Sequence, residues 1–564
     1  MPSPRRIVPN PRARGLLAVL AASVAAACTS AGPGAGAGSA GTDAGSAVTY
    51  RSHVAPLVEE HCAGCHRAGG SAPFALTSFA EVKSLAPVCL ASMVARRMPP
   101  WLPSPDCHPL QGSRRLPQDA IDRFGAWVSA GMPEGTGDVA RSPARPVARA
   151  LVPNVIATIP VEYISPEVDD DYRCFVLPAE FPATVYATGF DVESGSARVH
   201  HVLVYSLAGD ALTKARAADG RDGKPGYTCF SGVVPGVNAR ATSNLSEALP
   251  PLLGGWVPGS EPTLHADGVG QRIKAGSRLV VQMHYSALGG KPAPDHTRIR
   301  VETTREAPAQ LVDVRPLVNL DIPTPAGEVK THTATYTYFG THSRTIFGLT
   351  PHMHMLGTQL RSDRLTKAGG ESCVIDVPKW DFHWQQSYRT PAADPVTLES
   401  GDSMRLRCTY DNTAAKQPTV DGQKLPPQDV NWGEGTRDEM CLLYTASLRP
   451  FTSEHPGACE SVRACATAKP YALGKLFGCE SQEADCTLCE LSAVIACAGP
   501  QCQGQLLPMQ ACIRSCAFSS VLMSSNMGLC LEARCGAEYA AAKACVDAAL
   551  PTESCAGELG KCGL

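Results

Sequence analysis

The sequence predicts a multidomain fold: a small α-helical module, two antiparallel β-sandwich (jelly-roll) domains and a disulfide-rich helical C-terminal module. The length of 564 residues is enough for three or four domains of roughly 150 residues each. The pattern changes from helical to β-strand periodicity near residue 155, and 14 of the 24 cysteines lie after residue 450. A composition of 44% hydrophobic and 18% charged residues excludes a coiled coil or a wholly disordered chain. The net charge of −3 leaves no basic excess to neutralise phosphates, so no nucleic-acid partner is expected.

The first 27 residues have the organisation of a signal peptide. Several arginines precede an apolar stretch at 16–27, which is too short to span a membrane and ends just before Cys28. Small residues before a cysteine resemble a bacterial lipoprotein cleavage site, which would leave Cys28 lipidated; ordinary cleavage after the same stretch is the alternative. A flexible tether at 28–48 would follow, and either route exports the protein to the bacterial periplasm, the outer membrane or the cell surface. The many cysteines also indicate an oxidising compartment, and we expect membrane contact only through a lipid anchor.

Residues 49–137 are predicted to form the helical module. Apolar residues recur with helical spacing at 54–60, 79–97 and 118–130, and prolines and glycines separate these segments. The proline-rich segment at 138–154 is expected to be a linker.

A C-x-x-C-H motif at 62–66 predicts covalent haem attachment in this module. The thiols of Cys62 and Cys65 would form thioethers with the haem vinyl groups, and His66 would be the proximal iron ligand. We expect Met98 to be the distal ligand, because a thioether is an established axial ligand and the neighbouring prolines keep its loop rigid. Two other methionines of the module, Met93 and Met132, are the alternatives.

The module resembles small bacterial c-type cytochrome domains in this motif and in the segments at 50–57, 97–101 and 127–131. The resemblance implies a one-electron carrier with one covalently attached haem. Cys89 and Cys107 flank the methionine loop, and we predict a disulfide between them that clamps it.

Residues 155–450 have the texture of β-sandwiches. Short β-branched and aromatic runs, such as 197–207 and 402–410, are separated by Gly, Pro and Asp. A length of about 300 residues is too great for one such domain, so we predict two, at 155–310 and 311–450.

Five histidines of this β region are spaced for metal binding. Neighbours in a regular strand point to opposite faces, so His200 and His201 bind one ion only where the backbone is irregular, as at a strand end or bulge. His284 lies on a later predicted strand. His352 and His354 are two residues apart and therefore share one strand face. Copper and zinc both suit such ligands, and well-packed histidines without a metal are the remaining alternative.

The stretch at 200–444 resembles the copper type II, ascorbate-dependent monooxygenases, a family that includes peptidylglycine alpha-hydroxylating and dopamine beta-monooxygenases. Four elements match in the family's order: the double histidine, Gln-Met-His-Tyr at 282–285, His-Met-His at 352–354 and Asp-Glu-Met-Cys at 438–441. The resemblance implies two copper ions in separate sandwich domains that face a shared cleft. The electron-transfer copper would be bound by His200, His201 and His284, and the copper at which O₂ is reduced by His352, His354 and Met440. A thioether ligand would favour Cu(I) at the second site.

The implied reaction is hydroxylation of an aliphatic C–H bond of a small substrate, with one oxygen atom of O₂ entering the product and the other leaving as water. Ascorbate or a similar reductant, the tethered haem or an electron-donor protein would supply two electrons, and we expect the haem to reduce the electron-transfer copper. Peptidylglycine is not the expected substrate, because Thr350 and Leu442 stand where the peptide-amidating members have an arginine and an asparagine. Tyr444 matches the family's tyrosine and is assigned to the catalytic site. A non-catalytic copper- and haem-binding electron-transfer lipoprotein on the same scaffold is the competing class.

Other cysteines of the β region are assigned to disulfides. The resemblance implies a bond between Cys408 and Cys441, beside the methionine ligand. Cys174 and Cys229 are a further candidate pair, which leaves Cys373 without a partner.

Several residues around the histidines have expected supporting roles. Gln282 lies two residues before His284 on the same predicted strand face, so we expect it to position that imidazole. Met353 and Met355 would point away from their histidines and pack in the core. The other histidines of the region, His265, His342 and His383, are expected to be structural.

The tail at 451–564 is alanine- and cysteine-rich with a helical pattern. A helical module stapled by its own disulfides is the predicted structure. A thiol redox or metal site is the alternative, because Cys486 and Cys489 form a C-x-x-C pair; no histidine follows it, so it is not a second haem motif.

Overall fold

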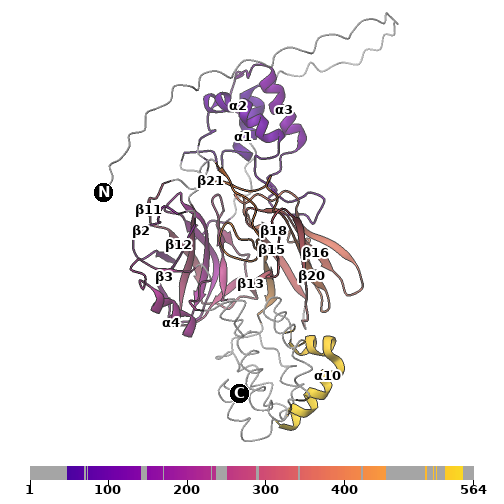
Figure 1. The fold of residues 1–564 in the computed structure, drawn as a ribbon. Coiled ribbons are helices and arrows are strands. Elements are labelled where there is room, and N and C mark those ends of the chain that lie inside the picture. The colour runs from indigo at the N-terminus through magenta and orange to yellow at the C-terminus, as the bar shows by residue number, and fades with distance from the viewer. Residues whose placement is uncertain are drawn as a thin grey trace, which may run out of the picture. The chain divides into compact units, whose positions relative to one another are not determined.

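The computed structural model describes residues 48–68, 72, 74–140, 149–168, 170–229, 232–236, 250–286, 291–340, 343–420, 423–451, 502, 504, 512, 516 and 527–549. The predicted signal peptide, the tether and Cys28 lie outside these residues, as do His342, Cys486 and Cys489. The described chain is mostly β-sheet, with a few helices and several disulfides (Figure 1).

Short helices form the first folded part of the chain (Figure 1, indigo to purple). They are η1 (Tyr50–Val54), α1 (Ala55–His61), α2 (Phe79–Val94) and α3 (Gln118–Ser129). Helix α2 begins with a capping box, in which Glu81 N donates to Ser78 Oγ and Ser78 N donates to the Glu81 carboxylate at 2.9 Å. Trp127 is fully buried among the helices and donates from Nε1 to the Pro133 carbonyl oxygen at 3.0 Å. This bond holds the chain that leaves α3 against the helical core.

A five-stranded antiparallel sheet, in the order β6-β3-β10-β5-β7, follows the helices. Its strands are β3 (Asp170–Phe181), β5 (Val199–Leu207), β6 (Tyr227–Thr228), β7 (Leu252–Trp256) and β10 (Ser277–Ser286). The central strand β10 pairs with β3 on one side and β5 on the other, so almost all of its side chains are buried. The short helix α4 (Gly209–Ala218) packs its Leu212 and Ala215 beside this sheet.

A ten-stranded sheet runs through both halves of the β region, in the order β1-β12-β4-β9-β13-β23-β15-β18, with β8 on β4 and β19 on β15. Its strands are β1 (Val155–Thr158), β4 (Val185–Glu193), β8 (Thr263–Leu264), β9 (Val269–Ile273), β12 (Arg298–Thr304), β13 (Gln310–Asn319), β15 (Arg344–His352), β18 (Tyr388–Arg389), β19 (Val396–Leu398) and β23 (Cys441–Pro450). Strand β13 joins the halves, because Gln310 pairs in parallel with Val269 of β9 while β13 pairs antiparallel with β23. The sheet is therefore continuous across residue 310, the boundary that the sequence predicts between two domains.

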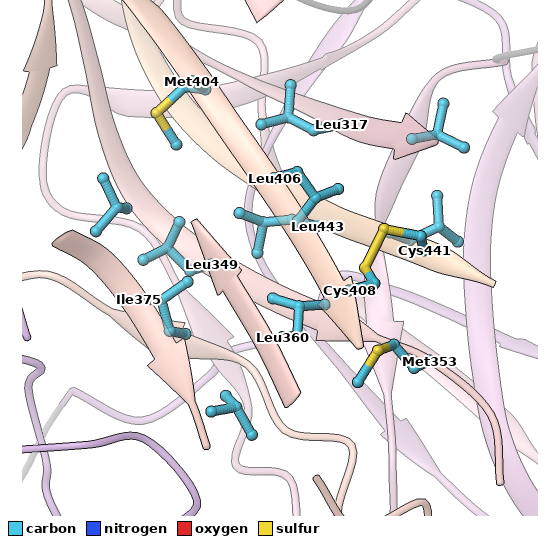
Figure 2. Close-up of a cluster of buried hydrophobic side chains, with 14 of the residues drawn as sticks. Leu317, Leu349, Met353, Leu360, Ile375, Met404, Leu406, Cys408, Cys441 and Leu443 are labelled. Carbon is cyan, nitrogen blue, oxygen red and sulfur yellow. A yellow bond between two sulfur atoms is a disulfide. The ribbon is translucent and has the colours of Figure 1, made fainter. Parts of the chain in front are cut away.

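Two apolar cores lie against this long sheet. In the first, side chains of β1, β4 and β12 pack with those of the five-stranded sheet. In the second, a four-stranded sheet in the order β14-β20-β16-β17 packs against β13, β15 and β23. Its strands are β14 (Val329–Thr337), β16 (Gly357–Leu365), β17 (Glu371–Val377) and β20 (Ser403–Asp411). Figure 2 shows this second core, where Leu349, Leu406 and Leu443 meet and Met353 is buried as expected.

The remaining elements are peripheral. Strand β2 (Tyr163–Ile164) pairs with β11 (Pro294–Asp295), and β21 (Thr419–Val420) pairs with β22 (Gln423–Lys424). The described part of the tail includes helix α10 (Met527–Ala549). Its disulfides join Cys502 to Cys545, Cys512 to Cys535 and Cys516 to Cys530. None of the described helices is long and apolar enough to span a membrane.

The disulfides of the β region include Cys174–Cys229 and Cys408–Cys441. The second joins β20 to β23 inside the core shown in Figure 2. Cys174 and Cys229 are both buried, and their bond ties β3 to the residue after β6.

The predicted Cys89–Cys107 disulfide is wrong, because Cys107 is bonded to Cys373 of β17 and Cys89 is a free thiol. The loop after α2 leaves the helical core and follows the four-stranded half, where Ser104 N donates to the Asp376 carbonyl oxygen at 2.7 Å. Cys107 is therefore carried to β17, whereas Cys89 stays on α2 against the helical core. The structure also gives Cys373 the partner that the sequence-based assignment lacked.

Candidate metal centres

Three histidines of the five-stranded sheet lie together. Cα pairing between β5 and β10 places His201 opposite His284, but Val199 opposite Tyr285. His200 is thus the extra residue of a β-bulge. The bulge is the predicted backbone irregularity, and it lets both neighbouring imidazoles reach the same side of the sheet.

The ring nitrogens of this three-histidine cluster have the arrangement of an open metal site. One ligand atom from each of His200, His201 and His284 lies within 4.8 Å of the others. All three Nδ1 atoms are buried and make no hydrogen bond among the described residues. Burial, reinforced by the charge of His284, lowers the pKa of His200 to about 3, so this imidazole is neutral at pH 7 and able to bind a metal. Unpartnered imidazole nitrogens on three converging rings fit a copper or zinc ion.

His284 is held by two neighbours from β3. Its Nε2 donates to Asp170 Oδ1 at 2.8 Å, which leaves Nδ1 for a metal. The ring of Tyr172 stacks on the imidazole, with centroids 4.2 Å apart and planes 9° apart. The expectation for Gln282 is wrong, because its Nε2 donates to the Cys229 carbonyl oxygen at 3.1 Å rather than to an imidazole.

Asp170 also reaches the other half of the β region. The backbone N–H of Thr436 donates to Asp170 Oδ2 at 3.2 Å, and the Thr436 hydroxyl donates to Oδ1. Burial opposes ionisation, but the hydrogen bonds from His284 and Thr436 hold the pKa of Asp170 below its usual range. One carboxylate therefore orients a histidine of the cluster and fixes the loop that leads to Met440.

The second predicted set lies at the end of β15. His352 is the last residue of the strand and His354 lies beyond it, directly before the turn at 355–356, so the pair does not lie on one regular strand. Their ring centroids are 5.2 Å apart. His352 Nδ1 donates to Gln385 Oε1 at 2.6 Å, and His354 Nδ1 donates to the Asp438 carbonyl oxygen at 3.0 Å. Both Nε2 atoms are thereby left for a metal, the reverse of the first cluster.

Glu439 and Met440 connect this turn to β23. The Glu439 carboxylate, fully buried, accepts hydrogen bonds from His354 N at 2.9 Å and from Leu356 N at 2.6 Å. The carbonyl oxygen of Met440 accepts a hydrogen bond from the Tyr410 hydroxyl at 2.8 Å. Since the next residue, Cys441, is disulfide-bonded, the backbone on both sides of Met440 is fixed.

The two histidine sets meet. The ring of His201 lies 6.2 Å from that of His352, centroid to centroid. Phe382 stacks on His200 with centroids 4.9 Å apart and also lies edge-on to His354 at 6.1 Å. A cavity of about 330 Å³ opens beside them, and His201, His352 and Met440 all line it.

Three further residues singled out in the sequence also line this cavity. Tyr444, Thr350 and Leu442 all face it. Tyr444 pairs across the sheet with Thr350, and burial with the nearby Glu434 raises the pKa of Tyr444 to about 12. The phenol therefore stays protonated at neutral pH and is available as a hydrogen-bond donor.

The C-x-x-C-H segment directly follows α1. Cys62 and Cys65 are free thiols. His66 Nδ1 donates to the Phe74 carbonyl oxygen at 3.2 Å, which leaves Nε2 for a metal. This tautomer and these two free thiols fit haem attachment.

The three methionines considered as distal haem ligands differ in their burial and packing. Met98 is half-buried on the loop after α2, Met93 is buried in the helical core and Met132 packs against that core. The loop of Met98 is fixed further along by Trp101, whose ring lies edge-on to Tyr388 with centroids 5.2 Å apart.

Several residues of the site carry no signal in the sequence. Asp170, Gln385 and Phe382 lie far in the sequence from the histidines they touch. Pairing of β3 with β10 brings Asp170 near His284, whereas Phe382 and Gln385 lie on the loop between β17 and β18. His383 is exposed, whereas His265 is buried and lines the cavity. Glu439 lies within a recognised motif, but nothing in the sequence shows that its carboxylate caps the histidine turn.

Comparison with known families gives a match in the second half of the β region. Residues 325–464 match the family described as copper type II ascorbate-dependent monooxygenase, C-terminal domain. The matched range contains His352, His354 and Met440. The match indicates copper and an oxidoreductase of the monooxygenase class.

Two solved structures resemble this chain remotely. The major capsid protein P2 from bacteriophage PM2 is 9% identical with a TM-score of 0.21, over 54% of this chain and 100% of that chain. Allantoicase is 9% identical with a TM-score of 0.13, over 44% of this chain and 80% of that chain. At such scores neither carries an argument about fold or function.

Proposed function

We propose that this protein is a copper-dependent monooxygenase that uses O₂ to hydroxylate an aliphatic C–H bond of a small substrate. The observation that carries the proposal is the meeting of two histidine sets at one cavity. The rings of His201 and His352 lie 6.2 Å apart, and both line the cavity with Met440. The match of residues 325–464 to a copper monooxygenase domain supports copper over zinc.

The candidate ligands would form two separate copper sites. His200, His201 and His284 would hold one ion through Nδ1, with Asp170 fixing the tautomer of His284. The second ion would be held by His352 and His354 through Nε2, together with Met440. Bound copper would supply the one-electron chemistry that O₂ reduction needs.

Each site would have three protein ligands, which leaves coordination positions open for O₂. The apolar cavity wall would exclude bulk water from the reacting C–H bond. Tyr444 is a protonated phenol in this wall and would donate a hydrogen bond to bound substrate.

Metal content tests the two-site assignment. We expect about two coppers per full-length chain by elemental analysis after copper loading and dialysis. The variants His284→Ala and Met440→Leu should each lose one copper and keep the other. Met440→Leu is close in volume, so the unfolding temperature of its metal-free form should match the unsubstituted chain. Zinc retained at both sites in place of copper, or no bound metal, would remove the proposal.

We also propose that the helical module carries a c-type haem on Cys62 and Cys65, with His66 and Met98 as axial ligands. Support comes from the free thiols and from the His66 Nδ1–H bond to Phe74. Chain produced with haem maturation should retain haem after acid–acetone extraction, whereas Cys62→Ser with Cys65→Ser should not. Met98→His should change the absorption spectrum of the haem, and Met93→Leu should leave it unchanged. A spectrum that changes in Met93→Leu and not in Met98→His would refute Met98 and assign Met93 as the distal ligand.

Electrons are proposed to pass from this haem to copper, beside or in place of ascorbate. The Cys107–Cys373 disulfide and the contact of Trp101 with Tyr388 hold the loop of Met98 against the half that contains His352. Stopped-flow mixing of reduced haem with copper-loaded and copper-free chain is the test. Haem oxidation at equal rates in the two forms would refute the transfer.

Export with a lipid on Cys28 is proposed from the N-terminal pattern. Incorporation of labelled palmitate into the full chain, and its loss in Cys28→Ser, would support the anchor. Labelling that persists in Cys28→Ser would refute it.

A further inference from the structure

One cation in the cavity wall has no counter-ion within the described part of the chain. Arg389 of β18 lines the cavity and forms no ion pair with a described carboxylate. Within the described chain, its guanidinium makes one hydrogen bond, from Nη1 to the Leu264 carbonyl oxygen at 3.1 Å. The other N–H donors of this half-buried group therefore have no partner among the residues that the structure describes. A desolvated guanidinium with free donors is a strong binder of oxyanions.

A second unpartnered group lies in the same wall. His265 is 8% exposed, lines the cavity, and its Nε2 is buried without a hydrogen-bond partner among the described residues. Burial, followed by the charges of Arg389 and Arg149, lowers the pKa of His265 to about 4. The imidazole is thus neutral at pH 7, and it lies close enough to Arg389 for the guanidinium charge to lower its pKa. A ligand oxygen near Arg389 would satisfy both groups at once.

The register of the sheet relates this pair to the candidate copper site. Arg389 is paired with Gly348 of β15, and Gly348, Thr350 and His352, which follow one another at every second position of this strand, all line the cavity. Gly348 has no side chain, so the Arg389 side chain is not crowded by its cross-strand neighbour. His352 is four positions further along the strand than Gly348, a distance of roughly 13 Å.

We propose that Arg389 and His265 form a carboxylate-binding subsite, and that the substrate is a small molecule with one carboxylate and an apolar body that extends toward His352 and Met440. The assignment of this ligand as substrate rests on the proposed function; the binding subsite itself does not. Arg389 lies on β18 opposite Gly348, and His265 directly follows β8. Both positions are distinct from Thr350, where the sequence lacks the arginine of the peptide-amidating relatives.

The rest of the cavity favours a singly charged, otherwise apolar ligand. Apolar residues dominate its wall, among them Leu252, Trp256, Val314, Leu320 and Trp432. The other arginine of the wall, Arg315, is already paired with Asp313 at 2.9 Å. Burial raises the pKa of Glu434 to about 8, so this wall residue adds no negative charge at neutral pH. One uncompensated cation matches one carboxylate and leaves a phosphate dianion half neutralised.

Binding of octanoate and octanamide to the full-length chain tests the subsite by calorimetry at pH 7, with and without copper. The two probes share an apolar chain and differ in charge. We expect octanoate to bind more tightly than octanamide, and Arg389→Met to weaken octanoate about 10- to 100-fold. His265→Phe should weaken octanoate and leave octanamide unchanged, and Arg389→Lys should retain part of the octanoate affinity.

Arg315→Met is the matched control, because it removes a cation of the same wall that already has a partner. Its octanoate affinity should stay within about twofold of the unsubstituted chain. Equal affinities for the two probes, or octanoate binding unaffected in Arg389→Met with normal thermal unfolding, would overturn the subsite. Unchanged octanoate binding in His265→Phe would overturn the role of the imidazole.

The same data separate this inference from the proposed function. Octanoate binding that depends on Arg389 in a chain unable to retain copper supports the subsite and refutes the monooxygenase. Copper-dependent hydroxylation of neutral apolar compounds with no dependence on Arg389 supports the monooxygenase and refutes the subsite.

Discussion

Replacing Asp170 with asparagine should weaken copper binding at the three-histidine cluster. The carboxylate accepts a hydrogen bond from His284 Nε2 at 2.8 Å and two from Thr436. Asparagine keeps the shape of the side chain but removes the charge, so the imidazole becomes a weaker ligand and its ring is held less firmly.

The size of the effect follows from these contacts. Loss of a carboxylate that orients a ligating histidine costs about 10- to 100-fold in metal affinity. The side chain of Asp170 is only 15% exposed, so water replaces little of the lost charge. We therefore expect the upper part of that range for this site. Asp170 makes no described hydrogen bond or ring contact with His352, His354 or Met440, so the copper that they would hold should be affected less.

Copper titration against a competing chelator, on the full chain, measures the two affinities separately. Thr436→Val is the matched control, because it removes the hydroxyl bond to Asp170 and leaves the His284 bond intact. Asp170→Asn should lower the affinity of the three-histidine cluster, and Thr436→Val should leave that affinity within about threefold. Equal affinities of Asp170→Asn and the unsubstituted chain would refute the reasoning that this carboxylate tunes the site.

Two further predictions concern stability. Non-reducing peptide mapping should find Cys107 joined to Cys373, and replacing both with serine should lower the free energy of unfolding by about 2–5 kcal/mol in denaturant titration; a peptide joining Cys89 to Cys107 would contradict the structure. Arg173, buried with 2% of its side chain exposed, holds the pKa of Asp222 below its usual range despite some desolvation. Because that pKa is depressed on folding, the stabilisation should be complete above the unfolded Asp value of about 4 and lost as pH falls further. Asp222→Asn should remove this part of the acid dependence of urea unfolding, and an unchanged pH profile would show that the pair is not linked to stability.

Local patterns in the sequence predict where the helices and strands lie better than they predict how these elements are arranged in space. Helical spacing places α2 and α3 correctly, and β-branched runs place strands such as β5 and β20. The boundary expected at residue 310 is not visible as a break in the ten-stranded sheet, because β13 pairs with both β9 and β23. Pairing between strands distant in sequence depends on packing energies that periodicity does not encode.

In the candidate site, too, local patterns were predictable from the sequence and contacts between distant segments were not. The adjacent His200 and His201 require a bulge if they share an ion, and the structure has one. The sequence could not reveal that Asp170 touches His284, because the two residues are brought together by pairing of β3 with β10. The error over Cys89 has the same origin: proximity along the chain suggested a partner, whereas the loop carries Cys107 to β17.

Isotope labelling tests the central claim most directly. Copper-loaded full chain, reduced with ascorbate, is incubated with cell extract under ¹⁸O₂, with Met440→Leu as the matched control. We expect a metabolite that gains one ¹⁸O atom as a hydroxyl group, together with an equal amount of ¹⁸O-labelled water. With Met440→Leu we expect neither the labelled metabolite nor the labelled water. Consumption of ¹⁸O₂ by fully copper-loaded chain without any labelled organic product would contradict a monooxygenase.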